Sequence, residues 1–176
     1  DTAFSPDYGA TNNQNRWLLA LSQKLTESIT PQWLLYGQDQ QAAQLGLNLT
    51  ALLGDATVSY LEWSGGNSRS QLSQALQTAD DTQFHQRAAA GATYTTGNKL
   101  SLTLEYAYND AALNSAQWEA LQSGSPLAYG RYRLWTQWVQ EIPTQRMATV
   151  FAYWPDAMLQ HLDLSAMVRS NLADNS

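Results

Sequence analysis

The sequence predicts an all-β fold built from antiparallel, up-and-down strands. The segment 100–108 reads LSLTLEYAY, in which apolar and polar residues alternate almost without a break. The segment 45–51 shows the same period of two. Successive side chains of a strand point to opposite sides of a sheet, so each such strand has one apolar and one polar face. Short stretches rich in Gly, Asn, Asp or Pro separate several of these segments and are typical of tight turns.

Nine strands are expected within a single domain that spans residues 1–176, without an internal repeat or a linker. Most of them reach the roughly 9–11 residues that a tilted strand needs to cross a bilayer. In chain order the expected strands are 16–25, 32–39, 43–53, 56–64, 84–95, 99–109, 128–140, 146–154 and 159–169.

Short and long connections are expected at opposite ends of these strands. Tight turns are predicted at 54–55, 96–98 and 143–145, and long polar loops at 65–83 and 110–127. This asymmetry is typical of outer-membrane barrels, whose periplasmic turns are short and whose extracellular loops are long. The two long loops are therefore expected on the cell exterior.

A short helix is predicted within the second long loop, over residues 114–123. Asn114 can cap its first turn, Gln117 can complete a capping box, and Gly124 can end it. The helix would lie either in the mouth of a barrel, narrowing it, or on the rim.

The composition favours strands that are half in lipid and half in water. Charged residues make up 14% of the chain, against about 25% in soluble domains, and Gln, Asn, Ser and Thr supply most of the polarity. We therefore expect a transmembrane β-barrel, or a contiguous multi-strand part of one. The net charge of −6 argues against nucleic acid as a partner. The chain has no cysteine, which excludes disulfides and thiolate metal sites.

Aromatic residues gather near the ends of the expected strands. Trp and Tyr suit the two interfaces of a membrane, because their rings favour hydrocarbon while the N–H or O–H group favours water. The interface candidates are Trp17, Trp63, Tyr108 and Trp154 at the outer ends, and Trp33, Tyr94 and Trp138 at the inner ends.

Four segments resemble the strands of Gram-negative outer-membrane β-barrel proteins, which are broadly porin-like. They are LGLNLTALL at 45–53, AAAGATY at 88–94, LSLTLEYAY at 100–108 and LDLSAMV at 162–168. The resemblance is one of pattern, covers most of the chain and carries over no functional residue. It implies a location in the bacterial outer membrane and contact with membrane lipid and lipopolysaccharide.

An odd number of strands and a polar segment at 171–176 depart from a complete barrel, which has an even count. The sequence therefore predicts a fragment of a larger barrel, completed by further strands or by partner chains.

Each side of the expected strands carries its own set of candidates. Outward faces are nearly free of charge, with Glu62 as the main exception. The lipid-facing candidates are Leu45, Leu47, Leu49, Leu100, Leu102, Leu104, Leu162 and Leu164. The lumen-lining candidates are Arg16, Lys24, Arg87, Glu105, Arg131, Arg133, His161 and Asp163.

Two of these candidates, Arg131 and Arg133, are expected to share one strand face opposite Glu105. They would either bias a pore toward anions or form an ion-pair ladder that fills the lumen.

Neither a metal site nor catalysis is expected. His85 and His161 lack the spacing of metal ligands. Asp80 and Asp81 form a pair in the first long loop, but a solvated pair is favoured, because a calcium site needs more converging oxygens. No motif that activates a nucleophile appears, so the chain is not expected to be an enzyme.

The expected function is a passive outer-membrane channel, or the barrel part of a transporter, without a cofactor. Two alternatives stay open. One is a closed structural barrel whose interior is filled by side chains. The other is a soluble all-β domain that binds carbohydrate through exposed Trp and Tyr.

Overall fold

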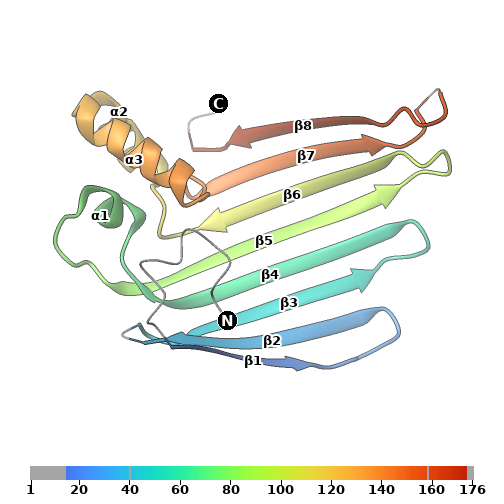
Figure 1. Cartoon of the computed structure of the whole chain (residues 1–176), viewed down its shortest axis with the longest axis horizontal. Helices are drawn as coiled ribbons and strands as arrows, with labels where there is room; N and C mark the ends of the chain where they lie inside the picture. Colours follow the sequence, from blue (N-terminus) through green and yellow to red (C-terminus); the bar gives the residue numbers. More distant parts are fainter. Residues whose placement is uncertain (1–14, 40, 158, 174–176) are drawn as a thin grey trace.

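Eight antiparallel strands form one open sheet in the computed structural model, which describes residues 15–39, 41–157 and 159–173. Each strand pairs with the next one along the chain, so the all-β, up-and-down organisation is confirmed (Figure 1). The strands are β1 (Arg16–Ser22), β2 (Ile29–Gln38), β3 (Gln44–Leu52), β4 (Thr57–Ser68), β5 (Gln83–Thr95), β6 (Ser101–Asn109), β7 (Arg146–Trp154) and β8 (Leu164–Asn171). The helices are α1 (Gln71–Leu76), α2 (Ser115–Ser123) and α3 (Pro126–Trp138).

One face of the sheet is apolar along its whole width. The register runs without a slip between neighbouring strands, so alternate residues line up in rows; Leu104, for example, pairs with Ala92 and Val150. Such rows bring Leu, Trp, Tyr, Val and Ala together on what we call the apolar face. Among the described strand residues, its one charged member is Arg146, at the first position of β7.

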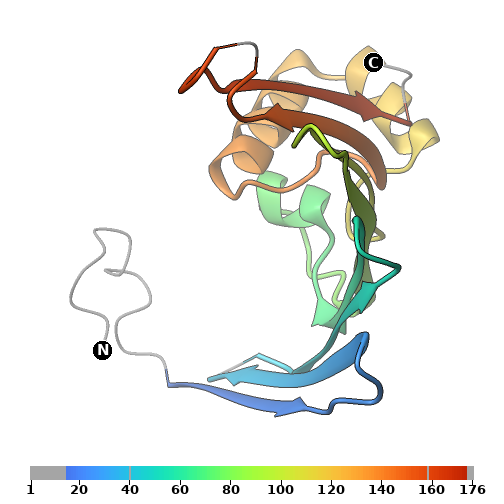
Figure 2. The same cartoon turned by 90° about the vertical axis from the view of Figure 1, so that its right-hand side faces the viewer.

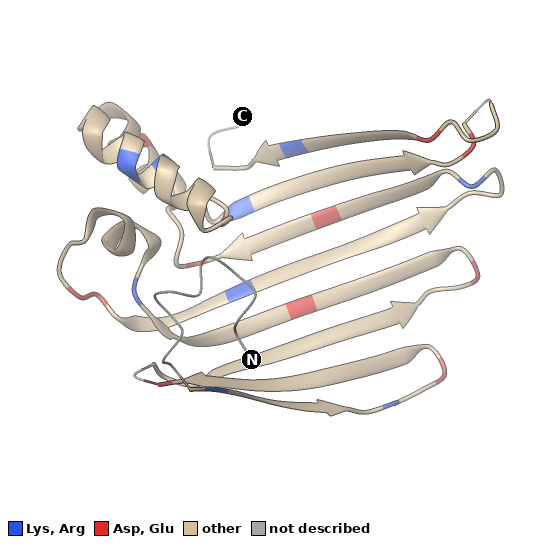
Figure 3. Cartoon of the chain, viewed as in Figure 1, with Lys and Arg blue, Asp and Glu red and all other residues tan. Residues whose placement is uncertain are grey.

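The opposite face, which we call the polar face, carries the other charged strand residues. They are Arg16, Glu62, Arg87, Glu105 and Arg169. Figure 3 marks where charged residues occur along the strands. Glu141, which follows α3, pairs with Arg87 on this face, and the sheet curves around the side on which the helices lie (Figure 2). The polar face is therefore the concave one and the apolar face the convex one.

The expectation that Glu62 points outward is wrong. Glu62 pairs with Asn48 on β3 and with Ala89 on β5, both on the polar face. The neighbouring Leu61 and Trp63 take the apolar face instead. The alternation of residues 58–63 would allow Glu62 on either face of the sheet. Pairing with β3, whose leucines clearly share one face, decides which face each residue takes.

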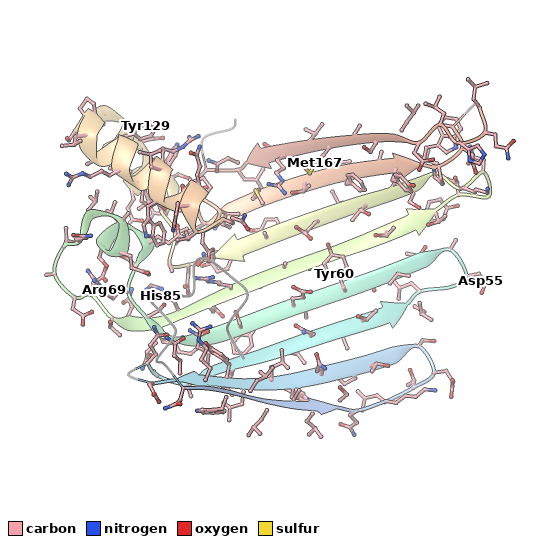
Figure 4. All side chains as sticks on the ribbon, viewed as in Figure 1. Asp55, Tyr60, Arg69, His85, Tyr129 and Met167 are labelled. Atoms are coloured by element: carbon pink, nitrogen blue, oxygen red, sulfur yellow. The ribbon has the colours of Figure 1, made fainter. Side chains whose placement is uncertain are left out.

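The two longest connections lie at one end of the strands and two of the expected tight turns at the other, although the short β2–β3 connection shares the end of the long ones. The turns at 53–56 and 96–100 lie at one end, the short-turn end, where Figure 4 labels Asp55. The connections 69–82 and 110–145 lie at the other, the long-connection end, near His85 and Arg69. The turn expected at 143–145 is at this same end, between α3 and β7, and not opposite it.

The expected strand over 128–140 is instead the helix α3, so the strand count is eight rather than nine. Ser125 caps the helix and Pro126 occupies its first turn, which is a typical helix start. Tyr132 and Thr136 lie four residues apart and are both buried, as the helical period requires. The alternation of Arg131, Tyr132, Arg133 and Leu134 thus reflects no sheet. Among the described residues, no helix is long and apolar enough to cross a bilayer.

Removing one strand reverses the direction of the strands that follow it. β7 runs from the long-connection end to the short-turn end, so Trp154 lies at the end opposite to the one expected. The connection 155–163 joins β7 to β8 at the short-turn end.

Two glycine substitutions test this description of α3 and of the polar face. A Cβ atom at Gly130 in α3 meets nothing within 4 Å, so Gly130→Ala should stabilise the protein by about 0.5–1 kcal/mol, the usual gain within a helix. A Cβ atom at Gly91 would lie 2.5 Å from the Tyr60 hydroxyl and 2.8 Å from the Leu104 carbonyl oxygen. Gly91→Ala should therefore destabilise the protein in denaturant titrations. A loss of stability with Gly130→Ala would contradict the helix.

Candidate functional site

The helical part of the 110–145 connection begins with α2, as the sequence predicts. The Asn114 side chain accepts a hydrogen bond from the Gln117 backbone N–H at 2.9 Å, and the Gln117 side chain accepts one from the Asn114 N–H at 3.0 Å. This reciprocal pair is the capping box expected at this position. The chain then passes Gly124 and enters α3 at once.

A small buried core joins α1, α2 and α3 into one unit. Tyr132, Trp118 and Leu113 are at most 2% exposed, and the rings of Trp118 and Tyr132 meet edge to face at 6.4 Å. The Tyr132 hydroxyl lies 2.8 Å from Gln71 Oε1 in α1 and 2.7 Å from the Pro143 carbonyl oxygen. Burial raises the pKa of Tyr132. We call this unit, residues 69–82 together with 110–145, the helical cap.

The helical cap is anchored to the polar face of the sheet just after α3. Glu141 forms an ion pair with Arg87 and accepts a hydrogen bond from Asn109 Nδ2 at 3.2 Å. On the way to β7, the Gln145 N–H donates to the Leu113 carbonyl at 2.9 Å. The helix predicted at 114–123, α2, packs on α3. The part of the helical cap that reaches over the polar face is residues 140–142 and not α2.

A cavity of about 350 Å³ lies between the polar face and residues 140–142. Its floor has little side-chain volume, because Gly46, Ala89 and Ala107 lie there on three strands. Its polar lining comes from the strands and from the helical cap: Asn48, Glu62, Ser64, Arg87, Asn109 and Glu141. Amide, hydroxyl, carboxylate and guanidinium groups around an open volume of this size can hydrate or bind a small polar solute.

Further toward the short-turn end, a tyrosine bridges two strands on the polar face. The Tyr60 hydroxyl donates a hydrogen bond to the Glu105 carboxylate. Figure 4 labels Tyr60 on β4. Tyr60 reaches Glu105 across Gly91, which lies between them in the ladder and has no side chain to obstruct the contact. This contact holds one of the two strand carboxylates in place. The sequence alone offers no signal for it, because the residues come from three strands.

The lumen-lining candidates are dispersed over three parts of the molecule. Arg16, Arg87 and Glu105 lie on the polar face, where a lumen-lining role stays a prediction. The remaining strand-end candidates, Lys24, His161 and Asp163, lie in the β1–β2 and β7–β8 connections at the short-turn end. Two charged strand residues of the polar face, Glu62 and Arg169, were not among the candidates.

Arg131 and Arg133 do not share a face. Both belong to α3, and residues two positions apart on a helix point about 200° apart around its axis. Arg133 is half-buried, with its guanidinium carbon 5.8 Å from the centre of the Trp118 ring and 5.9 Å from that of Tyr129. Arg131 is exposed. The expected pair opposite Glu105 is therefore wrong.

Most of the lipid-facing candidates do lie together on the apolar face, and contact with lipid stays a prediction. Leu45 and Leu104 are 54% and 62% exposed, and Leu102 and Leu164 are 42% and 45% exposed. Leu47 and Leu49 occupy the same face on β3. Leu100 and Leu162 lie in the β5–β6 and β7–β8 connections, outside the strands.

The aromatic candidates also favour the apolar face. Six of them lie there: Trp17, Trp33, Trp63, Tyr94, Tyr108 and Trp154. Trp63 Nε1 donates to Gln86 Oε1 at 3.2 Å, and Trp154 Nε1 donates to the Asn98 carbonyl at 3.0 Å. Trp138, by contrast, ends α3 and is 81% exposed.

The two histidines lie at opposite ends of the strands. His85 is 7% exposed, and its Nδ1 atom lies 3.0 Å from the Asp110 carboxylate, which also accepts the Gln86 N–H at 2.8 Å. These contacts tie β5 to the connection that follows β6. Within the described ranges, no three His, Asp or Glu residues converge in a way that could hold a metal ion.

The aspartate pair in the first long connection caps α1 and the turn after it. Asp81 accepts hydrogen bonds from the Ser70 and Ser73 hydroxyls. Burial alone would raise the pKa of Asp81, but these hydrogen bonds outweigh it and lower the pKa. The Thr82 hydroxyl and N–H likewise lower the pKa of Asp80. The two carboxylates are thus satisfied by neighbouring residues.

No protein-family model, curated protein or solved structure matches this chain. Its function therefore has to be argued from its own residues.

Removing the Tyr132 hydroxyl tests whether its hydrogen bonds stabilise the helical cap. Tyr132→Phe keeps the ring but removes the hydroxyl that the buried Gln71 side chain and the Pro143 carbonyl oxygen contact, which should cost about 1–3 kcal/mol. Hydrogen exchange should speed up in α1 and α3 while β3 and β4 stay protected. Tyr129→Phe, on the same helix and half-buried, is the matched control and should change little. Equal effects of the two variants would show that the hydroxyl does not anchor the cap.

Proposed function

We propose that this chain forms part of the wall of a β-barrel in the bacterial outer membrane, and that the barrel is a passive channel or the barrel part of a transporter. The division of charge between the two faces of the sheet carries the proposal. Five of the charged strand residues lie on the concave face, and Arg146 alone lies on the convex face. A barrel wall in lipid needs this arrangement, because its outer band is apolar and its interior is wet.

The exposure of the apolar face supports lipid as its environment. Leu19, Leu104 and Val168, on three different strands, are 63%, 62% and 67% exposed. Soluble monomers rarely expose a continuous apolar patch larger than a few hundred Å². The described residues supply no second sheet to cover this one. Lipid acyl chains would cover it, with membrane lipid and lipopolysaccharide as the surrounding partners.

The helical cap indicates a barrel larger than eight strands. The interior of an eight-stranded barrel is just wide enough for its own side chains. A helix with its side chains is about 10–12 Å across, and α3 lies on the concave side of the sheet (Figure 2). The sheet and its cap would therefore need further strands, from the same protein or from partner chains, to close a barrel around them.

The open volume on the polar face favours a channel over a closed scaffold. Small residues at Gly46, Ala89 and Ala107 leave the cavity of about 350 Å³ unfilled. A scaffold barrel would fill this volume with side chains. Toward the short-turn end the polar face also carries apolar residues, among them Leu52 and Phe151, so the polar lining is concentrated near the helical cap.

An arginine on each face tests the membrane assignment. Leu104→Arg places a charge on the apolar face near the middle of β6 and should cost about 2–4 kcal/mol of folding free energy in lipid vesicles, the penalty near a bilayer midplane. Thr103→Arg, the adjacent residue on the polar face, should cost much less. The measurement is a denaturant titration of protein folded in vesicles. If Thr103→Arg were the more damaging of the two, the faces would be reversed. If the wild type stayed in water and never entered vesicles, the soluble carbohydrate-binding alternative would hold.

A tryptophan on each face of β5 tests the channel assignment. Ala89→Trp fills the floor of the 350 Å³ cavity and should lower single-channel conductance in planar bilayers, because it narrows the wet side. Ala90→Trp, the next residue, adds the same volume to the apolar face and should leave conductance unchanged. Equal conductance of the two variants would contradict passage along the polar face. Insertion of the wild type without any conductance would favour the closed scaffold.

A further inference from the structure

A second cavity lies on the other side of residues 140–142, between α3 and the strands β7 and β8. Its volume is about 610 Å³, within the range of sites that bind small molecules. Its polar lining comes mainly from α3 and the residues after it, with Arg169 contributed by β8. The residues that matter here are Arg133, Thr136, Gln137, Gln140 and Arg169.

The charge of this cavity is opposite to that of the chain as a whole. The chain carries a net charge of −6, yet two guanidinium groups, Arg133 and Arg169, line this one cavity. The cavity has one carboxylate in its lining, Glu141, and that carboxylate is paired with Arg87. Neither Arg133 nor Arg169 forms an ion pair with any described residue. Two positive charges thus face a shared volume without a neutralising partner among the residues described.

Arg133 is held in position before any ligand arrives. Its Nη1 atom donates to the Tyr129 hydroxyl at 3.3 Å, and its guanidinium lies over the rings of Trp118 and Tyr129. Because an aromatic ring supplies no oxyanion, the stacking fixes the side chain without satisfying its remaining N–H groups. A planar guanidinium with free N–H groups suits the paired oxygens of a carboxylate or a phosphate.

We propose that this cavity binds a small solute carrying an oxyanion, either a carboxylate or a phosphate. Arg133 and Arg169 would hold the oxyanion, and the Gln137 and Gln140 amides would hydrogen-bond the polar remainder of the solute. The site lies within one chain, so it goes beyond the proposed membrane function and does not require a complete channel. The sequence pattern could not locate it, because Arg133 and Arg169 belong to different elements and line one cavity only in the folded chain.

The helix supplies a matched control. Arg131 belongs to α3 as Arg133 does, but it is exposed and does not line the cavity. Arg131→Gln and Arg133→Gln therefore change the net charge of the protein by the same amount. If anions were attracted only by the overall charge of the protein, both substitutions would weaken binding equally. If anions bind in the cavity, only substitutions of Arg133 and Arg169 weaken binding.

The proposal is tested by titrating three probes into the folded chain in detergent micelles and measuring their binding by calorimetry. Inorganic phosphate and glucuronate carry the two oxyanions, and glucose is the neutral control. We expect at least one of the two anions to bind and glucose not to bind. Arg133→Gln and Arg169→Gln should each weaken that binding about tenfold, as expected for the loss of a charged hydrogen bond. Arg131→Gln should leave it within about twofold of the wild type, since it removes charge but no contact.

Three results would overturn the proposal: no binding of either anion, equal loss with Arg131→Gln and Arg133→Gln, or binding of glucose as tight as that of the better-bound anion. Arg169 is an exposed residue of the strand β8 and not part of the helical cap. Arg169→Gln therefore remains informative if Arg133→Gln disturbs the cap. Binding of phosphate alone would indicate a phosphate site, and binding of glucuronate alone would indicate a carboxylate site. Failure here would leave vesicle insertion and conductance unaffected, so it is distinguishable from failure of the membrane proposal.

Discussion

The unbroken register of the eight strands is the constraint on which the rest of the structure depends. A slip of one residue in any ladder would turn the side chains of that strand to the opposite face. Because no ladder slips, the leucines of β3 and β6 share one face, while Glu62 and Glu105 share the other. The polar concave face and the apolar convex face, on which the proposed membrane location rests, both follow from this alignment.

The helical cap depends on the sheet for its position and on its own core for its shape. Trp118 and Tyr132 pack α2 and α3 together, and the Arg87–Glu141 pair fixes the end of the cap against the polar face. Residues 140–142 then separate an acid-containing cavity beside Glu62 from an arginine-lined cavity beside Arg169. Residues 140–142 thus line both of the cavities on which the two proposals rest.

Sequence reasoning was accurate where a single strand carries its own signal. The expected β3, β5 and β6 differ from the observed strands by at most two residues at either end. The alternation of β3 and β6 has one simple interpretation, and the turn residues at 96–98 mark the end of β5. It was wrong at 128–140, where four residues alternate by chance within a helical period. Ser125 and Pro126 gave the better signal there, since together they mark a helix start. The error then reversed the expected direction of β7 and misplaced Trp154.

The sequence by itself determined the all-β class, the up-and-down order and the apolar faces of the clearest strands, because these depend on local periodicity and turn chemistry. The tertiary structure alone decided the face of Glu62, since pairing with β3 and β5 sets it. It also decided which arginines line a common cavity. Arg131 and Arg133 separate because they lie on a helix, and Arg133 and Arg169 line one cavity although they are 36 positions apart in the sequence. Contacts between distant segments are properties of the packed chain, and no local pattern encodes them.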